Sequence, residues 1–147
     1  MTARYWAPPR PGDIVHCRFP QDAFAVPGPK ERPALVIRVE TRRGSVDVEV
    51  AYGTSQRIDD VHAGEFVVVG SDPDAGLTKD TKFDLCNIVA LPFNEDWFGP
   101  DPASRFGRHP KRGRLNLENL QNKKNLQAAV AEAKHAGRLP VRGHRSA

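Results

Sequence analysis

Turn-forming residues divide the first two thirds of this chain into short segments, and this division most constrains its fold. The segments between the turns are apolar and rich in β-branched residues. In the first of them, Val15, Cys17 and Phe19 alternate with polar neighbours, as in a half-buried strand. Strands are predicted at residues 14–19, 34–40, 46–52, 65–69 and 83–91. This order of short strands predicts a mainly β fold, a small antiparallel β-barrel of about five strands.

The composition changes after the last of these strands. Residues 93–115 are rich in proline, glycine and arginine without a clear period, which predicts an irregular basic excursion. Trp97 and Phe98 are expected to anchor this excursion onto the barrel. With 147 residues, the chain is expected to form one domain whose barrel occupies residues 1–92.

A C-terminal α-helix is predicted within residues 116–137, centred on 119–136 and packed on the barrel. Asn116 and Asn119 are both good N-cap candidates. One apolar stripe has helical spacing and comprises Leu126, Ala129, Val130 and Ala133. Gly137 and Pro140 end the pattern, and residues 138–147 are predicted to be a disordered tail.

Charge is distributed unevenly along the chain. Residues 1–100 carry 11 Lys and Arg against 15 Asp and Glu, whereas residues 101–147 carry 11 against 3. A basic extension on a mildly acidic body is typical of contact with nucleic acid, although a solvated tail has the same composition. The extension contains few aromatic residues, so base stacking is not indicated there.

The sequence also bears on the compartment and on metal binding. Its apolar runs are shorter than the roughly 18 residues of a membrane helix, and residues 1–11 do not resemble a signal sequence. We therefore expect a cytoplasmic protein without a membrane partner. Cys17 and Cys86 are expected to be buried thiols, and the scattered histidines predict no metal site.

Arg32 is the most informative single residue, because it directly precedes Pro33 at the start of an apolar run. Proline fixes its own φ and favours extended backbone at the preceding residue. The guanidinium thus stands on a stiff backbone beside a Pro- and Gly-rich loop. This position suits a planar, bidentate contact with a phosphate. A surface arginine that meets only solvent or a carboxylate is the alternative.

Four segments in this order resemble the MazF/PemK family of toxin endoribonucleases from type II toxin–antitoxin systems. They are Gly12-Asp13-Ile14-Val15, Arg32-Pro33-Ala34-Leu35-Val36-Ile37, Thr54-Ser55-Gln56 and Gly76-Leu77-Thr78-Lys79-Asp80. Each string is short, and their order and spacing give the resemblance its specificity. The resemblance covers about residues 10–92 of the chain.

The resemblance implies an SH3-like barrel with a C-terminal helix, a homodimer, a groove for single-stranded RNA and inhibition by a cognate antitoxin. It implies RNA cleavage without a metal or another cofactor, in which the ribose 2′-hydroxyl attacks the adjacent phosphate. Arg32 and Thr54 match the family's catalytic arginine and threonine. By their chemistry alone, a fixed cation and a short hydroxyl at adjacent strand ends can stabilise the charge on a phosphate. A turn residue with a local backbone hydrogen bond is the alternative role for Thr54.

The group that accepts the 2′-hydroxyl proton is left open by the sequence. His16 has a suitable intrinsic pKa and is the possible base, although a solvent-facing surface histidine is the alternative. In the PemK branch an arginine and an aspartate on the last strand serve as acid and base, but the corresponding positions here are Leu85 and Asn87. This departure favours the scheme built on Arg32 and Thr54.

Further RNA contacts are predicted from the loops and the basic extension. The candidate RNA-binding residues are Lys30, Ser55, Gln56, Arg108, Lys111 and Arg112. The alternative to an endoribonuclease is a non-catalytic SH3-like barrel module that binds nucleic acid or a protein partner, because a fold alone does not fix a function.

Overall fold

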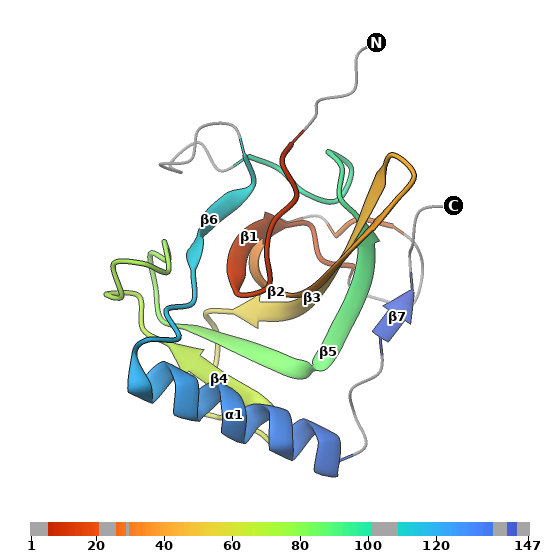
Figure 1. The fold of residues 1–147 in the computed structure, drawn as a ribbon. Helices are drawn as coiled ribbons and strands as arrows, with labels where there is room; N and C mark the ends of the chain where they lie inside the picture. Colours follow the sequence, from red (N-terminus) through yellow and green to blue (C-terminus); the bar gives the residue numbers. More distant parts are fainter. Residues whose placement is uncertain (1–5, 21–25, 29, 101–108, 137–140, 144–147) are drawn as a thin grey trace.

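A computed structural model describes residues 6–20, 26–28, 30–100, 109–136 and 141–143 of the chain. The predicted strands are present as β1 (Asp13–Cys17), β2 (Arg32–Arg42), β3 (Ser45–Thr54), β4 (Glu65–Val68) and β5 (Thr81–Pro92). Two more strands are β6 (Lys111–Arg114) and β7 (Val141–Gly143), and the helix is α1 (Leu120–His135). The sheet order is β4-β5-β3-β2-β1-β6, and all these neighbours pair antiparallel (Figure 1).

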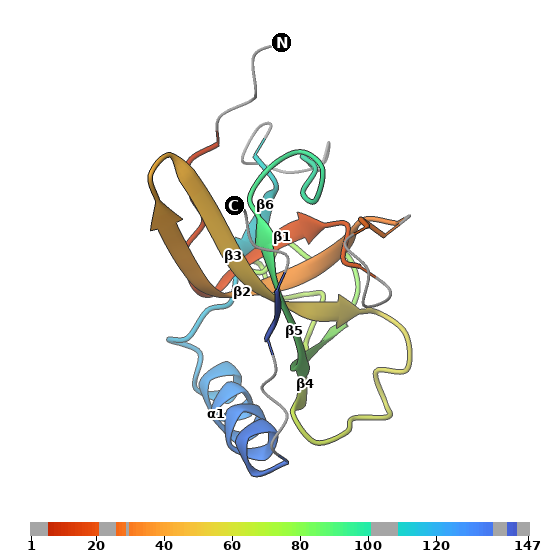
Figure 2. The same cartoon turned by 90° about the vertical axis from the view of Figure 1, so that its right-hand side faces the viewer.

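The mainly β fold with one C-terminal helix is therefore confirmed. Strand pairing in the described residues ends at β4 and β6 and does not join these two edges. The loop after β4 approaches β6 instead, where Arg114 N donates a hydrogen bond of 2.7 Å to Asp74 O. Figure 2 shows how strongly the sheet bends between these edges. Closure into an SH3-like barrel stays a prediction.

The bent sheet has apolar side chains on both of its faces, which form two core clusters. One cluster includes Ile14, Leu35 and Phe83 and is covered by α1; the other includes Val15 and Phe98. Ile14 and Val15 are neighbours on β1 and are both fully buried. The expectation that the first strand is half-buried is therefore wrong, because Ile14, on the face expected to point outward, packs in the cluster that α1 covers.

Helix α1 agrees with its prediction in extent and in orientation. Asn119 is the N-cap, and its side chain accepts a hydrogen bond from Asn122 N. Ala129 and Ala133 are buried against the sheet, and Leu126 and Val130 pack at the margin of the same cluster. Gly137, the expected end of the helix, lies outside the described residues. The helix lies along β4 and across the lower part of β5 (Figure 1).

Two segments expected to be irregular contain short strands. Residues Lys111–Arg114 form β6, which pairs antiparallel with β1, so the excursion over 93–115 is not irregular throughout. Val141–Gly143 pairs parallel with β5, within the tail expected to be disordered. Trp97 and Phe98 are buried as anchors, and Phe98 forms a bridge with Cys17. No helix among the described residues is long and apolar enough to cross a membrane.

Candidate functional site

Arg32 and Thr54 lie at neighbouring ends of two paired strands. Arg32 begins β2 and Thr54 ends β3, and the register pairs Ala34 with Tyr52. Arg32 and Thr54 lie two residues beyond this last pair on the same side, and both line one cavity. Between them, a Cβ on Gly53 would collide with the carbonyl oxygen of Pro33. Glycine is therefore needed for the close approach of the two strand ends.

A cavity of about 220 Å³ opens at these strand ends. Its lining residues come from four parts of the chain, and they are Glu31, Arg32, Pro33, Thr54, Ser55, Leu77, Thr78, Lys79, Thr81 and Arg112. Arg32, Lys79 and Arg112 supply cations, and Glu31 is the one carboxylate among the described lining residues. This excess of positive charge suits an anion, and the planar guanidinium groups suit a phosphate.

The loop between β4 and β5 brings Lys79 to this cavity, and β6 brings Arg112. The two segments are in very close contact, because a Cβ on Gly76 would collide with Arg112 O. Gly76 also has a φ of +68°, which side chains other than glycine rarely adopt. Next to Lys79, Asp80 Oδ1 accepts a hydrogen bond of 2.7 Å from Gly70 N, which fixes the end of the loop.

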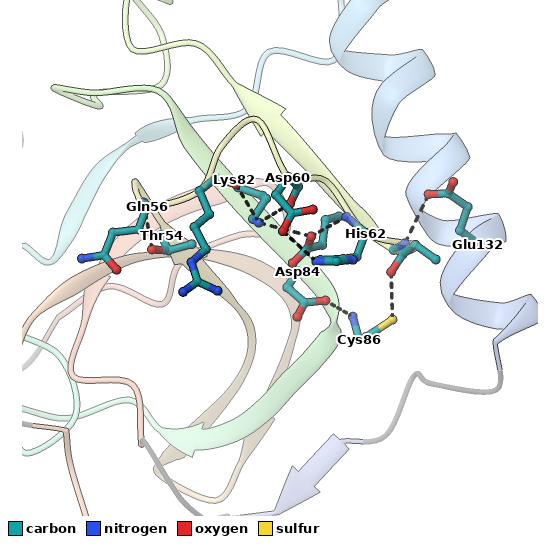
Figure 3. Close-up of polar contacts among 12 residues, drawn as sticks. Thr54, Gln56, Asp60, His62, Lys82, Asp84, Cys86 and Glu132 are labelled. Atoms are coloured by element: carbon teal, nitrogen blue, oxygen red, sulfur yellow. Dashed lines mark hydrogen bonds and ion pairs between the residues drawn. The ribbon is translucent and has the colours of Figure 1, made fainter.

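The Thr54 hydroxyl takes part in the turn that follows β3. Gln56 N donates a hydrogen bond of 3.1 Å to Thr54 Oγ1 (Figure 3). This is the local role that the sequence left as the alternative. The hydrogen bond holds the oxygen in place as an acceptor, and the hydroxyl proton remains available for donation to a ligand.

Arg32 is half-buried at the cavity wall. Within the described part of the chain, its guanidinium has no carboxylate close enough for an ion pair. Its neighbour Glu31 pairs elsewhere, so the charge of Arg32 is not neutralised by the adjacent residue. Among the described residues, Arg32 therefore does not pair with a surface carboxylate, which was one alternative role for it.

His16 is held by Glu31 and does not line the cavity itself. Its Nε2 lies 3.3 Å from Glu31 Oε2, and its side chain is 14% exposed. Arg18 NH2 lies 3.2 Å from the other carboxylate oxygen of Glu31. The alternative of a solvent-facing histidine is wrong, because the Glu31 carboxylate lies beside the imidazole ring. His16 can act on a ligand in the cavity only through Glu31.

A second cavity, of about 320 Å³, lies beside the first and shares Thr54 with it. Its lining is polar and comprises Tyr52, Thr54, Gln56, Arg57, Glu65, Lys82, Asp84 and Asn87. Lys82 is buried at its base and donates to Arg57 O at 3.0 Å and to Asp60 O at 2.7 Å. These bonds attach the loop after Thr54 to β5 (Figure 3).

Lys30 and Lys111 line neither of the two cavities. Lys30 is exposed and Lys111 Nζ lies 3.6 Å from Asp13 Oδ1, while Arg108 is outside the described residues. Leu85 is buried in the core. Of the predicted RNA-binding residues, Ser55 and Arg112 thus line the first cavity and Gln56 lines the second.

A larger cavity of about 540 Å³ lies between β6 and the start of α1. Its two cations, Lys111 and Arg114, both lie within ion-pair distance of the buried carboxylate of Asp13. Their charge is already compensated by the protein, so this cavity is a weaker anion site than the one beside Arg32.

Sequence reasoning missed two charged lining residues of the first cavity, Glu31 and Lys79. Lys79 stood inside one of the four matched segments but was not among the candidate site residues. Glu31 directly precedes Arg32, but nothing in the sequence indicates that its carboxylate reaches His16. In the described residues no three His, Cys, Asp or Glu side chains gather as a metal site.

No protein-family model matches the sequence, and no curated protein is significantly similar to it.

Proposed function

We propose that this protein is an endoribonuclease that cleaves single-stranded RNA, with its reaction centre in the cavity beside Arg32. The carrying observation is that Arg32, Thr54, Lys79 and Arg112 line one cavity of about 220 Å³. Three cations and a hydroxyl around one small space match the needs of a phosphodiester whose charge increases in the transition state.

The roles of the lining residues follow from their chemistry. Arg32 binds the non-bridging oxygens of the scissile phosphate with two parallel N–H donors, and Thr54 donates its hydroxyl proton to the same group. Lys79 and Arg112 hold the neighbouring phosphates of the strand. Because Arg32 starts a strand directly before a proline, its position is fixed before the RNA binds.

Glu31 is the best placed proton acceptor, since it is the carboxylate of this cavity among the described residues. The 2′-hydroxyl gives its proton to Glu31 while its oxygen forms a bond to phosphorus. The bond from phosphorus to the 5′-oxygen breaks, and that oxygen takes a proton from solvent. The products are a 2′,3′-cyclic phosphate and a free 5′-hydroxyl. His16 and Arg18 act as positioning residues for Glu31.

The biological setting of the proposal comes from the MazF/PemK resemblance. In that setting the chain is a cytoplasmic toxin that forms a homodimer and is inhibited by a cognate antitoxin. Under the proposal, the departure at Asn87 excludes the PemK-branch base and leaves proton transfer to Glu31.

The test is cleavage of a long unstructured RNA by the purified protein in excess EDTA. Wild-type protein is expected to cleave, and Arg32→Ala is expected to lower the rate by about 10²–10³-fold, as for loss of one transition-state donor. Arg32→Lys is expected to restore little activity, because an ammonium lacks the bidentate fork.

Arg38→Ala is the matched control, since Arg38 lies on the same strand, is exposed and does not line the cavity. This variant is expected to cleave like the wild type. Equal activity of Arg32→Ala and Arg38→Ala would contradict the proposed site. If no RNA is cleaved although RNA or a protein partner binds tightly, the chain is the binding module instead.

A further inference from the structure

We propose that Lys82 is a positioning residue for the reaction beside Arg32, because its buried ammonium holds the loop that orients the Thr54 hydroxyl. Lys82 does not line the cavity of Arg32, and its Nζ donates to carbonyl oxygens of the protein itself. The inference rests on the proposed function for its effect on RNA cleavage. Its effect on the loop can be measured without RNA.

The loop after β3, residues 55–64, has little apolar packing to hold it. These residues are all described, and none of them belongs to either core cluster. Within the loop, Arg57 has a φ of +53°, a left-handed conformation that residues other than glycine rarely adopt. Such a conformation persists only where the surrounding structure fixes it. Polar contacts therefore have to hold this loop.

Lys82 on β5 supplies these polar contacts. Its side chain is 7% exposed, and its Nζ donates hydrogen bonds of 3.0 Å to Arg57 O and of 2.7 Å to Asp60 O (Figure 3). Glu65 Oε1 lies 3.3 Å from the same nitrogen, so each N–H of the ammonium has an acceptor. This Glu65 oxygen also accepts a hydrogen bond of 2.7 Å from His62 N. One buried ion pair thus contacts the loop backbone near both of its ends.

The loop reaches the proposed reaction centre through the backbone of Gln56. Gln56 N donates a hydrogen bond of 3.1 Å to Thr54 Oγ1, and the next residue is Arg57, whose carbonyl oxygen Lys82 binds. The place of Gln56 N therefore limits the directions in which the hydroxyl can donate its own proton. Lys82 also pairs with Thr54 in the register of β3 and β5. The ammonium, the loop and the hydroxyl form one connected set of contacts.

The first experiment measures the loop alone, by limited digestion of the folded protein with trypsin. Cutting after Arg57 requires the loop to open, and cutting after Arg43 in the exposed β2–β3 turn is the internal reference. In Lys82→Ala, the rate at Arg57 relative to Arg43 is expected to rise about tenfold, the factor for one lost hydrogen bond to a charged group. Added n-propylammonium supplies the side-chain atoms that alanine lacks and is expected to lower this ratio again.

The second experiment measures RNA cleavage by the same variants. Lys82→Ala is expected to lower kcat about tenfold or more through misplacement of the hydroxyl, with little change in KM. Thr54→Val removes the hydroxyl at similar volume. Its effect is expected to be large in the wild type and small in Lys82→Ala, because Lys82 acts through Thr54. A residue that only stabilised the fold would leave the effect of Thr54→Val unchanged.

Lys124→Ala is the matched control, because it removes the same charge from an exposed position on α1 that lines neither cavity. It is expected to behave like the wild type in both experiments. Lys82→Ala leaves the Glu65 carboxylate without this cation, and circular dichroism checks that the variant folds. If it does not fold, Lys82→Met with Glu65→Gln takes its place, since this pair removes both charges and keeps an oxygen for His62 N.

Unchanged digestion after Arg57 in the folded variant overturns the proposal, and so does an effect of Thr54→Val that is equal with and without Lys82. Faster digestion with unchanged RNA cleavage overturns the positioning role as well. If the wild type cleaves no RNA, the proposed function fails, while protection of Arg57 that depends on Lys82 still supports the hold of Lys82 on the loop. The two proposals can therefore fail independently.

Discussion

At the scale of single residues, the two cysteines are expected to differ in reactivity. Cys17 is completely buried, and burial together with the nearby Glu31 carboxylate raises the pKa of its thiol well above the ordinary 9.0. Cys86 is half-buried on β5. Because the thiolate is the nucleophile, iodoacetamide at about pH 8 should alkylate Cys86 first and leave Cys17 intact until the protein unfolds. Mass spectrometry of the tryptic peptides measures this order.

The sign of the pH effect follows from the raised pKa of Cys17. Well below pH 9.0 the thiol is protonated in both the folded and the unfolded chain, so it does not change the free energy of unfolding. Above that pH the unfolded chain ionises and the folded chain does not, so stability is lost as the pH rises. Alkylation of Cys17 in the native protein at the same rate as Cys86 would contradict the burial.

Single residues also show what could be predicted about the site. Arg32 and Thr54 were named as candidates because the MazF/PemK resemblance marks both positions, and the pairing of β2 with β3 brings these strand ends together. The pairing of His16 with Glu31 could not be predicted. The contact depends on where the segment before β2 lies relative to β1, and the local sequence pattern carries no information about that placement.

At the scale of elements, β6 carries two arginines whose side chains lie in different places. Arg112 lines the phosphate cavity, whereas Arg114 NH1 lies 2.8 Å from Asp13 Oδ1 on β1. For uncleavable single-stranded DNA, Arg112→Ala should flatten the slope of log affinity against log salt by about 0.7, the value for one lost phosphate contact. Arg114→Ala should leave the slope nearly unchanged, because this cation is already paired within the protein. A larger change in Arg114→Ala than in Arg112→Ala would contradict this assignment.

Elements also differ in how well the sequence predicts them. The five longer runs and α1 carry strong local signals, such as alternation, an Asn cap and an apolar stripe. β6 has the sequence Lys-Arg-Gly-Arg, which has no strand propensity, and it exists because β1 offers a free edge to pair with. A short strand that forms only because a distant strand pairs with it cannot be predicted from its local sequence pattern.

At the scale of the whole molecule, both faces of the sheet carry a covered apolar cluster. Helix α1 closes one core cluster, and the Trp97–Phe98 segment closes the other. The polar cavities lie beside these clusters, because Leu77 lines the first cavity and Tyr52 the second, and both residues pack in the core clusters. The fold class was predictable from the strand order, and Trp97 and Phe98 were predicted as anchors. The second apolar cluster that they cover was not predicted, because the first strand was expected to be buried on one face alone.

The central claim is that the 2′-hydroxyl of RNA attacks its phosphate in the cavity beside Arg32. The most direct measurement uses an RNA oligonucleotide in which one mapped cleavage site carries a 2′-deoxyribose directly 5′ of the scissile phosphate, with the end groups of all products determined. The account predicts no cleavage at that bond, unchanged cleavage at unmodified sites, and products with a 5′-hydroxyl and a 2′,3′-cyclic phosphate. Cleavage at the deoxy site, or products that carry a 5′-phosphate, would contradict it.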